Sequence, residues 1–134
     1  MTKFYLNLYE AETLIPKLEK AILRLKDLNR AINLIESIEF ETNNEYLQVL
    51  NELKINKSYH KLNFLLYKEI EELFKMGAII KDLNEGIVDF YSIFNSREIL
   101  LCWKCGEKDI KFWHEVNSGF GGRKPIALLR NKID

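Results

Sequence analysis

Three short segments in the last third of the sequence carry residue types that commonly take part in chemistry. They are Cys102–Cys105 (CWKC), Trp113–Glu115 (WHE) and Gly119–Arg123 (GFGGR). Each segment has a spacing that functional sites use, and each also has a plain structural interpretation.

The Cys102 and Cys105 pair has the spacing of a zinc knuckle or of a redox-active dithiol. A structural zinc site needs four ligands, and the sequence contains no second pair of this kind. A Cys2His2 site would require both histidines, His60 and His114, to converge on the two thiols. We therefore expect no metal centre here, with Cys102 as a small strand residue and Cys105 as a turn residue.

His114 is the most versatile residue of the second segment, because an imidazole titrates near neutral pH. Glu115 cannot join it in one site on a regular strand, since successive side chains point to opposite faces. A carboxylate from another strand, Asp89 or Asp82, could instead orient the imidazole for acid–base chemistry or ligand binding. The structural alternative is a half-buried His114 satisfied by one backbone or carboxylate partner.

Arg123 ends a glycine-rich segment whose backbone could approach an anion closely, and its guanidinium is always charged. No helix with a Lys-Ser/Thr pair follows, so the segment is not a nucleotide-binding fingerprint. The structural alternative is a connection in which Arg123 pairs with a carboxylate of the same chain. The candidate ligand-binding residues are Asp89, Arg97, His114, Glu115 and Arg123.

The first part of the chain predicts a long antiparallel helical hairpin over residues 8–76. Asn7 and Glu10 have the spacing of a capping box at its start. Pro16 removes an amide donor, so we expect a short helix to end near Thr13 and the first long helix to begin at the proline.

Apolar residues recur every three or four positions through this long helix to about Ile38, a heptad pattern typical of a coiled coil. A polar turn over residues 39–44 precedes the second long helix. The stretch Lys54–Ser58 breaks the apolar period, so the helix could be continuous, bend or restart there. Gly77 is expected to end it.

After Gly77 the apolar period changes to that of a strand. Short turns separate four such segments and make them antiparallel neighbours, so we expect a four-stranded β-meander over residues 78–116. The segments are Ala78–Leu83, Ile87–Ile93, Arg97–Lys104 and Ile110–Val116. Residues 117–134 are expected to form a Gly-rich loop and tail. The fold class is α+β, in one domain over residues 1–134.

Several motifs occur together in an order and spacing that resembles one prokaryotic family. They are Glu10-Ala11 with Leu14–Pro16, then Gly86–Phe90 (GIVDF), Arg97-Glu98, Leu101–Lys104 (LCWK), Gly106-Glu107, Trp113–Glu115 and Gly119–Arg123. The chain resembles, over nearly its whole length, the family catalogued as domain of unknown function 2203. The resemblance implies no activity. Cys105 departs from the family pattern, which usually has an apolar residue there, so the resemblance does not favour a cysteine-pair metal site.

The charge balance argues against binding to nucleic acid, because 20 basic side chains face 20 acidic ones and the balance holds along the chain. A local patch of Arg123, Lys124, Arg130 and Lys132 is the weakest alternative. No apolar run is long enough to span a membrane, and the N-terminus lacks the apolar stretch of a signal peptide. With only two cysteines, a cytoplasmic location is expected.

Apolar residues lie along the heptads and on both faces of the third and fourth strands. These surfaces are expected to be covered by other protein surface, such as a second copy of the chain. The leading interpretation is a homo-oligomeric assembly or adaptor protein, a homodimer with an apolar edge that includes Ile15, Ile22, Leu47 and Leu65. The alternative is a small-ligand-binding protein or enzyme with a His/Asp/Arg site on the C-terminal sheet. The sequence identifies no cofactor.

Overall fold

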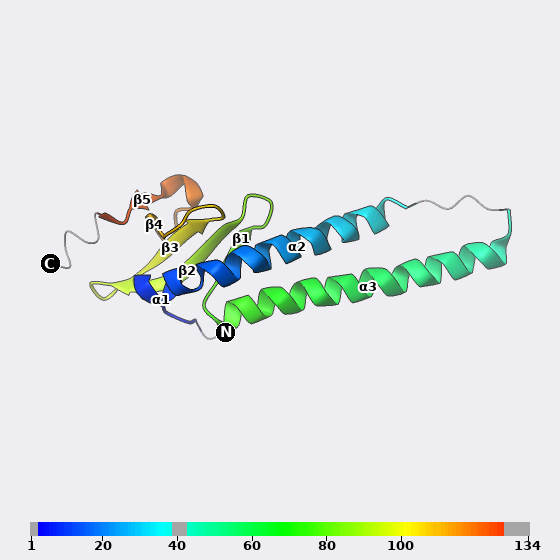
Figure 1. The fold of residues 1–134 in the computed structure, drawn as a ribbon, viewed down its shortest axis with the longest axis horizontal. Coiled ribbons are helices and arrows are strands. Elements are labelled where there is room, and N and C mark those ends of the chain that lie inside the picture. The colour runs from blue at the N-terminus through cyan, green and yellow to red at the C-terminus, as the bar shows by residue number, and fades with distance from the viewer. Residues whose placement is uncertain (1–2, 39–42, 128–134) are drawn as a thin grey trace.

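The computed structural model describes residues 3–38 and 43–127. A long helical hairpin carries an antiparallel sheet at its open end (Figure 1), which confirms the α+β class. Five strands follow one another in the order β1-β2-β3-β4-β5. The elements are α1 (Leu8–Thr13), α2 (Ile15–Glu36), α3 (Glu45–Lys75), β1 (Ile79–Asp82), β2 (Ile87–Phe94), β3 (Arg97–Lys104), β4 (Phe112–Glu115), the 3-10 turn η1 (Phe120–Gly122) and β5 (Lys124–Pro125).

The start of the helical hairpin is as the sequence predicts. The Asn7 side chain accepts from the Glu10 amide at 2.7 Å, and the Glu10 carboxylate accepts from the Asn7 amide at 3.0 Å, which completes the capping box. Helix α1 ends at Thr13, and Pro16 lies in the first turn of α2, where its missing amide costs nothing. Helix α2 ends at Glu36, two residues before the predicted end.

Helix α3 is continuous through Lys54–Ser58. That stretch contains neither glycine nor proline, so the loss of apolar period there changes what is exposed and does not break the helix. Gly77 follows the last turn with φ +98°, the left-handed conformation of a C-terminal glycine. Residues 39–42 of the predicted turn lie outside the described residues.

A tight turn at Asn95-Ser96, with φ of 51° and 61°, joins β2 to β3 and sets their register. Only β3 has the predicted bounds among the described strands: β1 is one residue shorter at each end, and β2 extends one residue further. Strand β4 begins two residues later and ends one residue earlier than expected, and a fifth strand lies within residues 117–134, which were predicted as loop and tail. Through η1 the chain turns back and pairs β5 with the free edge of β4. A two-residue strand has no alternation to detect, and its proline is tolerated because the strand lies at the edge.

Among the described residues, the helices pack on one face of the sheet. Strand residues of this face share one core with the helices, among them Val88, Phe90, Leu101, Trp103 and Trp113. Ile15 and Ile22 are buried in the same core. They are therefore not part of a free apolar edge, which corrects that part of the prediction. In the described part of the chain, no helix has the length and apolarity needed to cross a bilayer.

The opposite face, which we call the outer face, is partly covered by the chain itself. The Arg123 guanidinium lies 4.0 Å from the centre of the Phe112 ring and 4.5 Å from that of Phe120, so the segment after β4 folds back over this face. Part of the cover that we expected from a second copy is thus intramolecular.

Candidate functional site

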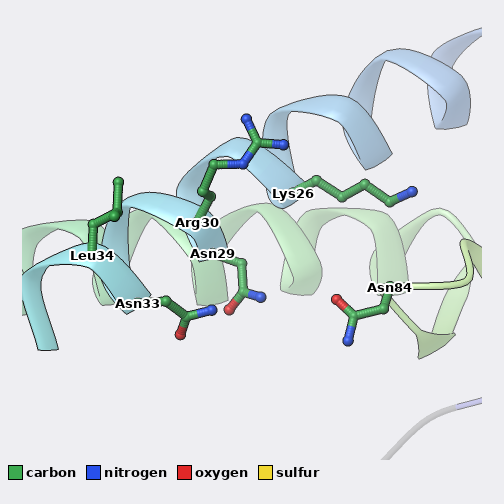
Figure 2. A pocket seen from close by; sticks show the side chains of 6 residues that line it. All are labelled: Lys26, Asn29, Arg30, Asn33, Leu34 and Asn84. Atoms are coloured by element: carbon green, nitrogen blue, oxygen red, sulfur yellow. The ribbon is translucent and has the colours of Figure 1, made fainter. Parts of the chain in front are cut away.

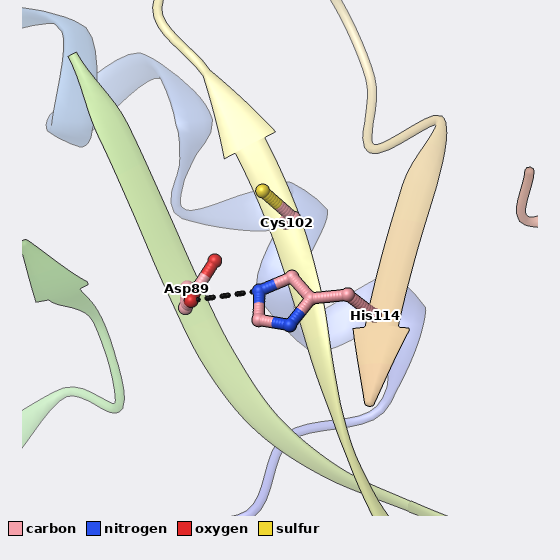
Figure 3. A group of neighbouring side chains, drawn as sticks. All are labelled: Asp89, Cys102 and His114. Atoms are coloured by element: carbon pink, nitrogen blue, oxygen red, sulfur yellow. Dashed lines mark hydrogen bonds and ion pairs between the residues drawn. The ribbon is translucent and has the colours of Figure 1, made fainter. Parts of the chain in front are cut away.

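Three buried side chains project from neighbouring strands on the outer face. The register pairs Asp89 of β2 with Cys102 of β3, and it pairs Leu100 of β3 with His114 of β4. Antiparallel partners share a face and side chains alternate along a strand, so Asp89, Cys102 and His114 all point to the same side. Figure 3 shows them converging, and one potential metal-binding atom from each lies within 4.8 Å of the others.

Two hydrogen bonds of the Asp89–His114 pair determine how many protons the pair holds. His114 Nδ1 is 2.8 Å from the Glu115 carbonyl oxygen, which can only accept, so Nδ1 carries a proton. His114 Nε2 is 2.9 Å from Asp89 Oδ2, and this contact also needs one proton. Whether that proton resides on the ring or on the carboxyl, the pair as a whole is neutral, as burial requires.

One carboxylate oxygen of Asp89 accepts no hydrogen bond within standard geometry, and the weakly donating thiol of Cys102 is the donor that lies beside this carboxylate. The residue is only 2% exposed, and within the described part of the chain its Oδ1 has no hydrogen-bond partner. A buried acceptor without a hydrogen bond costs about 1–3 kcal/mol of stability, so such atoms are rare and call for an explanation. Oδ1 is thus a free acceptor beside an otherwise satisfied pair.

Cys102 completes the group. Burial, and then the nearby charge of Asp89, raises the pKa of its thiol to about 12. The thiol is therefore protonated at neutral pH in the metal-free protein and is a poor nucleophile.

A cavity of about 430 Å³ lies against this group. Its size is in the range of small-molecule sites. It is lined by Lys81, Asp82, Ile87, Asp89, Leu100, His114, Val116, Asn117, Ser118, Gly119 and Phe120. Asp82, the other carboxylate considered for His114, lines this cavity too, but its side chain accepts from the Glu85 amide at 3.0 Å.

Arg123 lies beside the group but does not line the cavity. Its guanidinium pairs with Glu107, whose two oxygens are 2.9 and 3.1 Å from Nη2, and it also donates to the Cys102 carbonyl at 3.4 Å. This partly buried ion pair links the segment after β4 to the end of β3. Arg123 is thereby placed to hold the covering segment rather than to meet a ligand.

Arg97 and Glu115 lie on the helical face of the sheet, opposite His114. They form an ion pair at 3.1 Å, and Lys124 approaches the same carboxylate at 3.4 Å. Of the five candidate ligand-binding residues, the structure brings Asp89 and His114 together. Arg123 lies beside them outside the cavity lining, and Arg97 and Glu115 lie on the other face.

Cys105 does not join the buried group. It is half-buried in the turn after β3, and its amide donates to the Gly86 carbonyl at 2.8 Å. The residue that sequence reasoning missed is Cys102 as a neighbour of Asp89 and His114. The signal was the two-residue turn Asn95-Ser96, which by itself places Cys102 opposite Asp89.

A second hollow of about 380 Å³ lies along α2 and is lined by polar and basic side chains (Figure 2). Its lining residues are Lys26, Asn29, Arg30, Asn33, Leu34 and Asn84. None of them is buried. This hollow therefore lacks the fixed, buried polar group that the cavity of the outer face has.

The fold and the site define an α+β protein with a helical hairpin on one sheet face and a buried Asp–Cys–His group on the other. The chain belongs to the family described as uncharacterized conserved protein (DUF2203), whose model matches residues 5–126. This confirms the resemblance seen in the sequence. No curated protein and no solved structure matches the chain.

Proposed function

We propose that this protein binds a small polar ligand in the outer-face cavity lined by Asp89 and His114. The observation that carries the proposal is the buried, unpartnered Oδ1 of Asp89. A ligand with an N–H, an O–H or a positive charge would satisfy this oxygen and recover the free energy that its burial costs.

The surroundings of Asp89 support the same proposal. Asp89 and His114 come from the two strands that flank β3, so a rigid sheet holds their side chains in place. The Arg123–Glu107 ion pair holds the segment that covers this face. Binding at such a site would order little additional structure, which favours affinity.

A protein-observed NMR screen tests this proposal. Small amines, alcohols, amides and carboxylic acids are titrated into chelator-treated protein. We expect shifts at the amides of Leu100, His114 and Ser118, and at least about tenfold weaker binding for Asp89→Asn, because a charge-assisted hydrogen bond is lost. Asp109→Asn, which changes an exposed carboxylate outside the cavity lining, is the matched control and should bind as the wild type does. Shifts confined to other regions, or equal binding by Asp89→Asn, would reject the proposal.

We also propose that the protein is a homodimer that associates through the helical hairpin, in the manner of an assembly or adaptor protein. Residues 45–58 of α3 contain no buried side chain. Large apolar residues are exposed along the helix, including Tyr46, Leu47, Val49, Leu53, Phe64 and Leu65. A second hairpin packed on this surface would remove them from water in a coiled-coil arrangement.

Sedimentation velocity at micromolar concentration tests the dimer. We expect a dimer for the wild type and a monomer for the Leu47→Lys/Leu53→Lys variant. Ile93→Lys, which places a charge at an exposed apolar position of the sheet, should remain dimeric. A monomeric wild type would refute this proposal without affecting the ligand site.

The remaining expectations have unequal support. The free thiols of Cys102 and Cys105 fit the cytoplasmic location expected from the sequence. Binding to nucleic acid has the least support, because Arg123 and Lys124 are engaged with carboxylates. Arg130 and Lys132 of the same proposed patch lie outside the described residues.

A further inference from the structure

The buried group on the outer face combines three side chains that each offer a metal-binding atom. We propose that a zinc ion, or a similarly thiophilic divalent metal, binds between the Asp89 carboxylate, the Cys102 sulfur and Nε2 of His114. The inference rests on the proposed function, since the metal would be the primary ligand of that site. It differs from the cysteine-pair site considered from the sequence, because Cys105 takes no part.

The distances suit such an ion. Zinc bonds of about 2.0–2.3 Å in a tetrahedral arrangement place ligand atoms about 3.3–3.8 Å apart. The three donor atoms already lie within 4.8 Å of one another, and the Asp89–His114 contact is 2.9 Å. Metal binding would therefore open this contact by about 0.5 Å and draw the thiol inward by up to about 1 Å, which side-chain rotation can supply.

The hydrogen bond on the far side of the imidazole is the one that metal-binding histidines use. A ligating histidine almost always donates its other ring N–H to a carbonyl or carboxylate, which fixes the tautomer and turns the free lone pair toward the metal. In this protein the Glu115 carbonyl accepts from Nδ1 at 2.8 Å, so Nε2 is left facing Asp89 and Cys102. The ring is therefore already oriented as a metal-binding histidine would be.

The charges also balance. In the metal-free protein the Asp89–His114 pair is neutral and the thiol is neutral. A divalent ion would displace the proton shared by the pair and the thiol proton, so two protons leave while two positive charges arrive. The complex of one carboxylate, one thiolate and one neutral imidazole with the ion is again neutral, as a buried site favours.

The donor set selects the class of metal and leaves a position free. Thiolate and imidazole favour zinc and related ions over Mg²⁺ and Ca²⁺, which prefer oxygen ligands. Three protein ligands to zinc are typical of sites that keep a fourth position for water or a substrate. The cavity lined by Asp89 and His114 adjoins the group, so a water or a small molecule in this cavity would be the fourth ligand.

Cobalt titration of the chelator-treated full chain tests the inference, since Co²⁺ bound to a thiolate gives a charge-transfer band in the near ultraviolet. We expect one equivalent to bind. Cys102→Ser should lose the band, whereas Cys105→Ser, the matched control, should retain it. Asp89→Asn keeps the thiolate but should bind cobalt at least about tenfold more weakly, so it provides a second reading if Cys102→Ser does not fold. Circular dichroism verifies the fold of each variant.

The outcomes separate this inference from the broader proposal. The absence of a band in the wild type, or a band that depends on Cys105 instead of Cys102, would overturn the metal site. If the metal-free protein then still binds small polar molecules in the NMR screen, the proposed function survives without the metal. If neither cobalt nor any screened molecule binds, both are wrong.

Discussion

Replacing Asp89 separates two roles of its carboxylate, because asparagine and alanine change its bond to His114 differently. Nδ1 of His114 is committed to the Glu115 carbonyl, so once a neutral residue replaces Asp89 the neutral ring presents the lone pair of Nε2 to position 89. The amide of asparagine can donate an N–H to that lone pair and keep the 2.9 Å contact. Alanine removes the partner altogether.

The expected magnitudes follow from burial. Asp89→Ala leaves a buried ring nitrogen without a partner, at about 1–3 kcal/mol, and also opens a small void. We therefore expect Asp89→Ala to lower the free energy of unfolding by about 2–4 kcal/mol. Asp89→Asn should lower it by about 1 kcal/mol or less, since shape and hydrogen bond are both retained. In a domain of this size, 1 kcal/mol corresponds to about 4 °C in Tm.

Urea unfolding and calorimetry of chelator-treated protein at neutral pH measure both variants. Asp89→Asn should lie close to the wild type and well above Asp89→Ala. If the two variants are equally destabilised, the hydrogen-bond arrangement assigned to His114 is wrong. If both are as stable as the wild type, the pair does not contribute to folding.

Three other outcomes are expected. In the metal-free native protein, Ellman's reagent should modify the half-buried Cys105 quickly and the buried Cys102 only on unfolding; two equally fast thiols would contradict this burial. The hydrogen bond from Lys3 holds the pKa of Glu98 in the folded protein below its usual 4.5. The ionised Glu98 therefore stabilises the fold above its unfolded-state pKa, and this stabilisation is lost as the pH falls through the lowered pKa of the folded protein. Between about pH 5 and 3 the wild-type Tm should fall more steeply than that of Glu98→Gln, and parallel curves would exclude the effect. Gly86→Ala should lose more than about 1 kcal/mol by urea unfolding, because φ is +68° and the new Cβ would lie 2.6 Å from Cβ of Cys105; wild-type stability would show that the turn can relax.

Local signals made much of the fold predictable from the sequence. The capping box at Asn7 and the position of Pro16 gave the start of the hairpin, because both depend on amide donors within one helical turn. The change of apolar period after Gly77 gave the sheet. The two-residue β5 escaped prediction since its pairing depends on where the chain returns after η1, and no pattern of its own carries that information.

The site was harder to predict because its members are neighbours only across strands. Cys102 has Cys105 as its obvious partner in the sequence, but the pleat and the register place it beside Asp89 and His114. The two-residue turn between β2 and β3 would have shown that Asp89 lies opposite Cys102. The longer connection between β3 and β4 leaves the register of His114 open until the sheet is known.

The ion-pair partners of Arg97 and Arg123 could not be predicted from the sequence for a different reason. Arg97 and Arg123 were candidates because a guanidinium binds anions well, but each has a carboxylate partner within the chain, Glu115 and Glu107. A long side chain can reach many partners, and the nearest carboxylate depends on strand register and on the path of the covering segment.

The most direct test of the site is a high-resolution crystal structure of the protein purified without chelator and then exposed to zinc. We expect a bound metal ion or small molecule in contact with Asp89 and flanked by Cys102 and His114. Oδ1 of Asp89 should then have a partner, either the metal or a hydrogen-bond donor of the bound molecule. An outer-face cavity holding only solvent, with Asp89 satisfied entirely by groups of its own chain, would contradict the assignment of this face as a binding site.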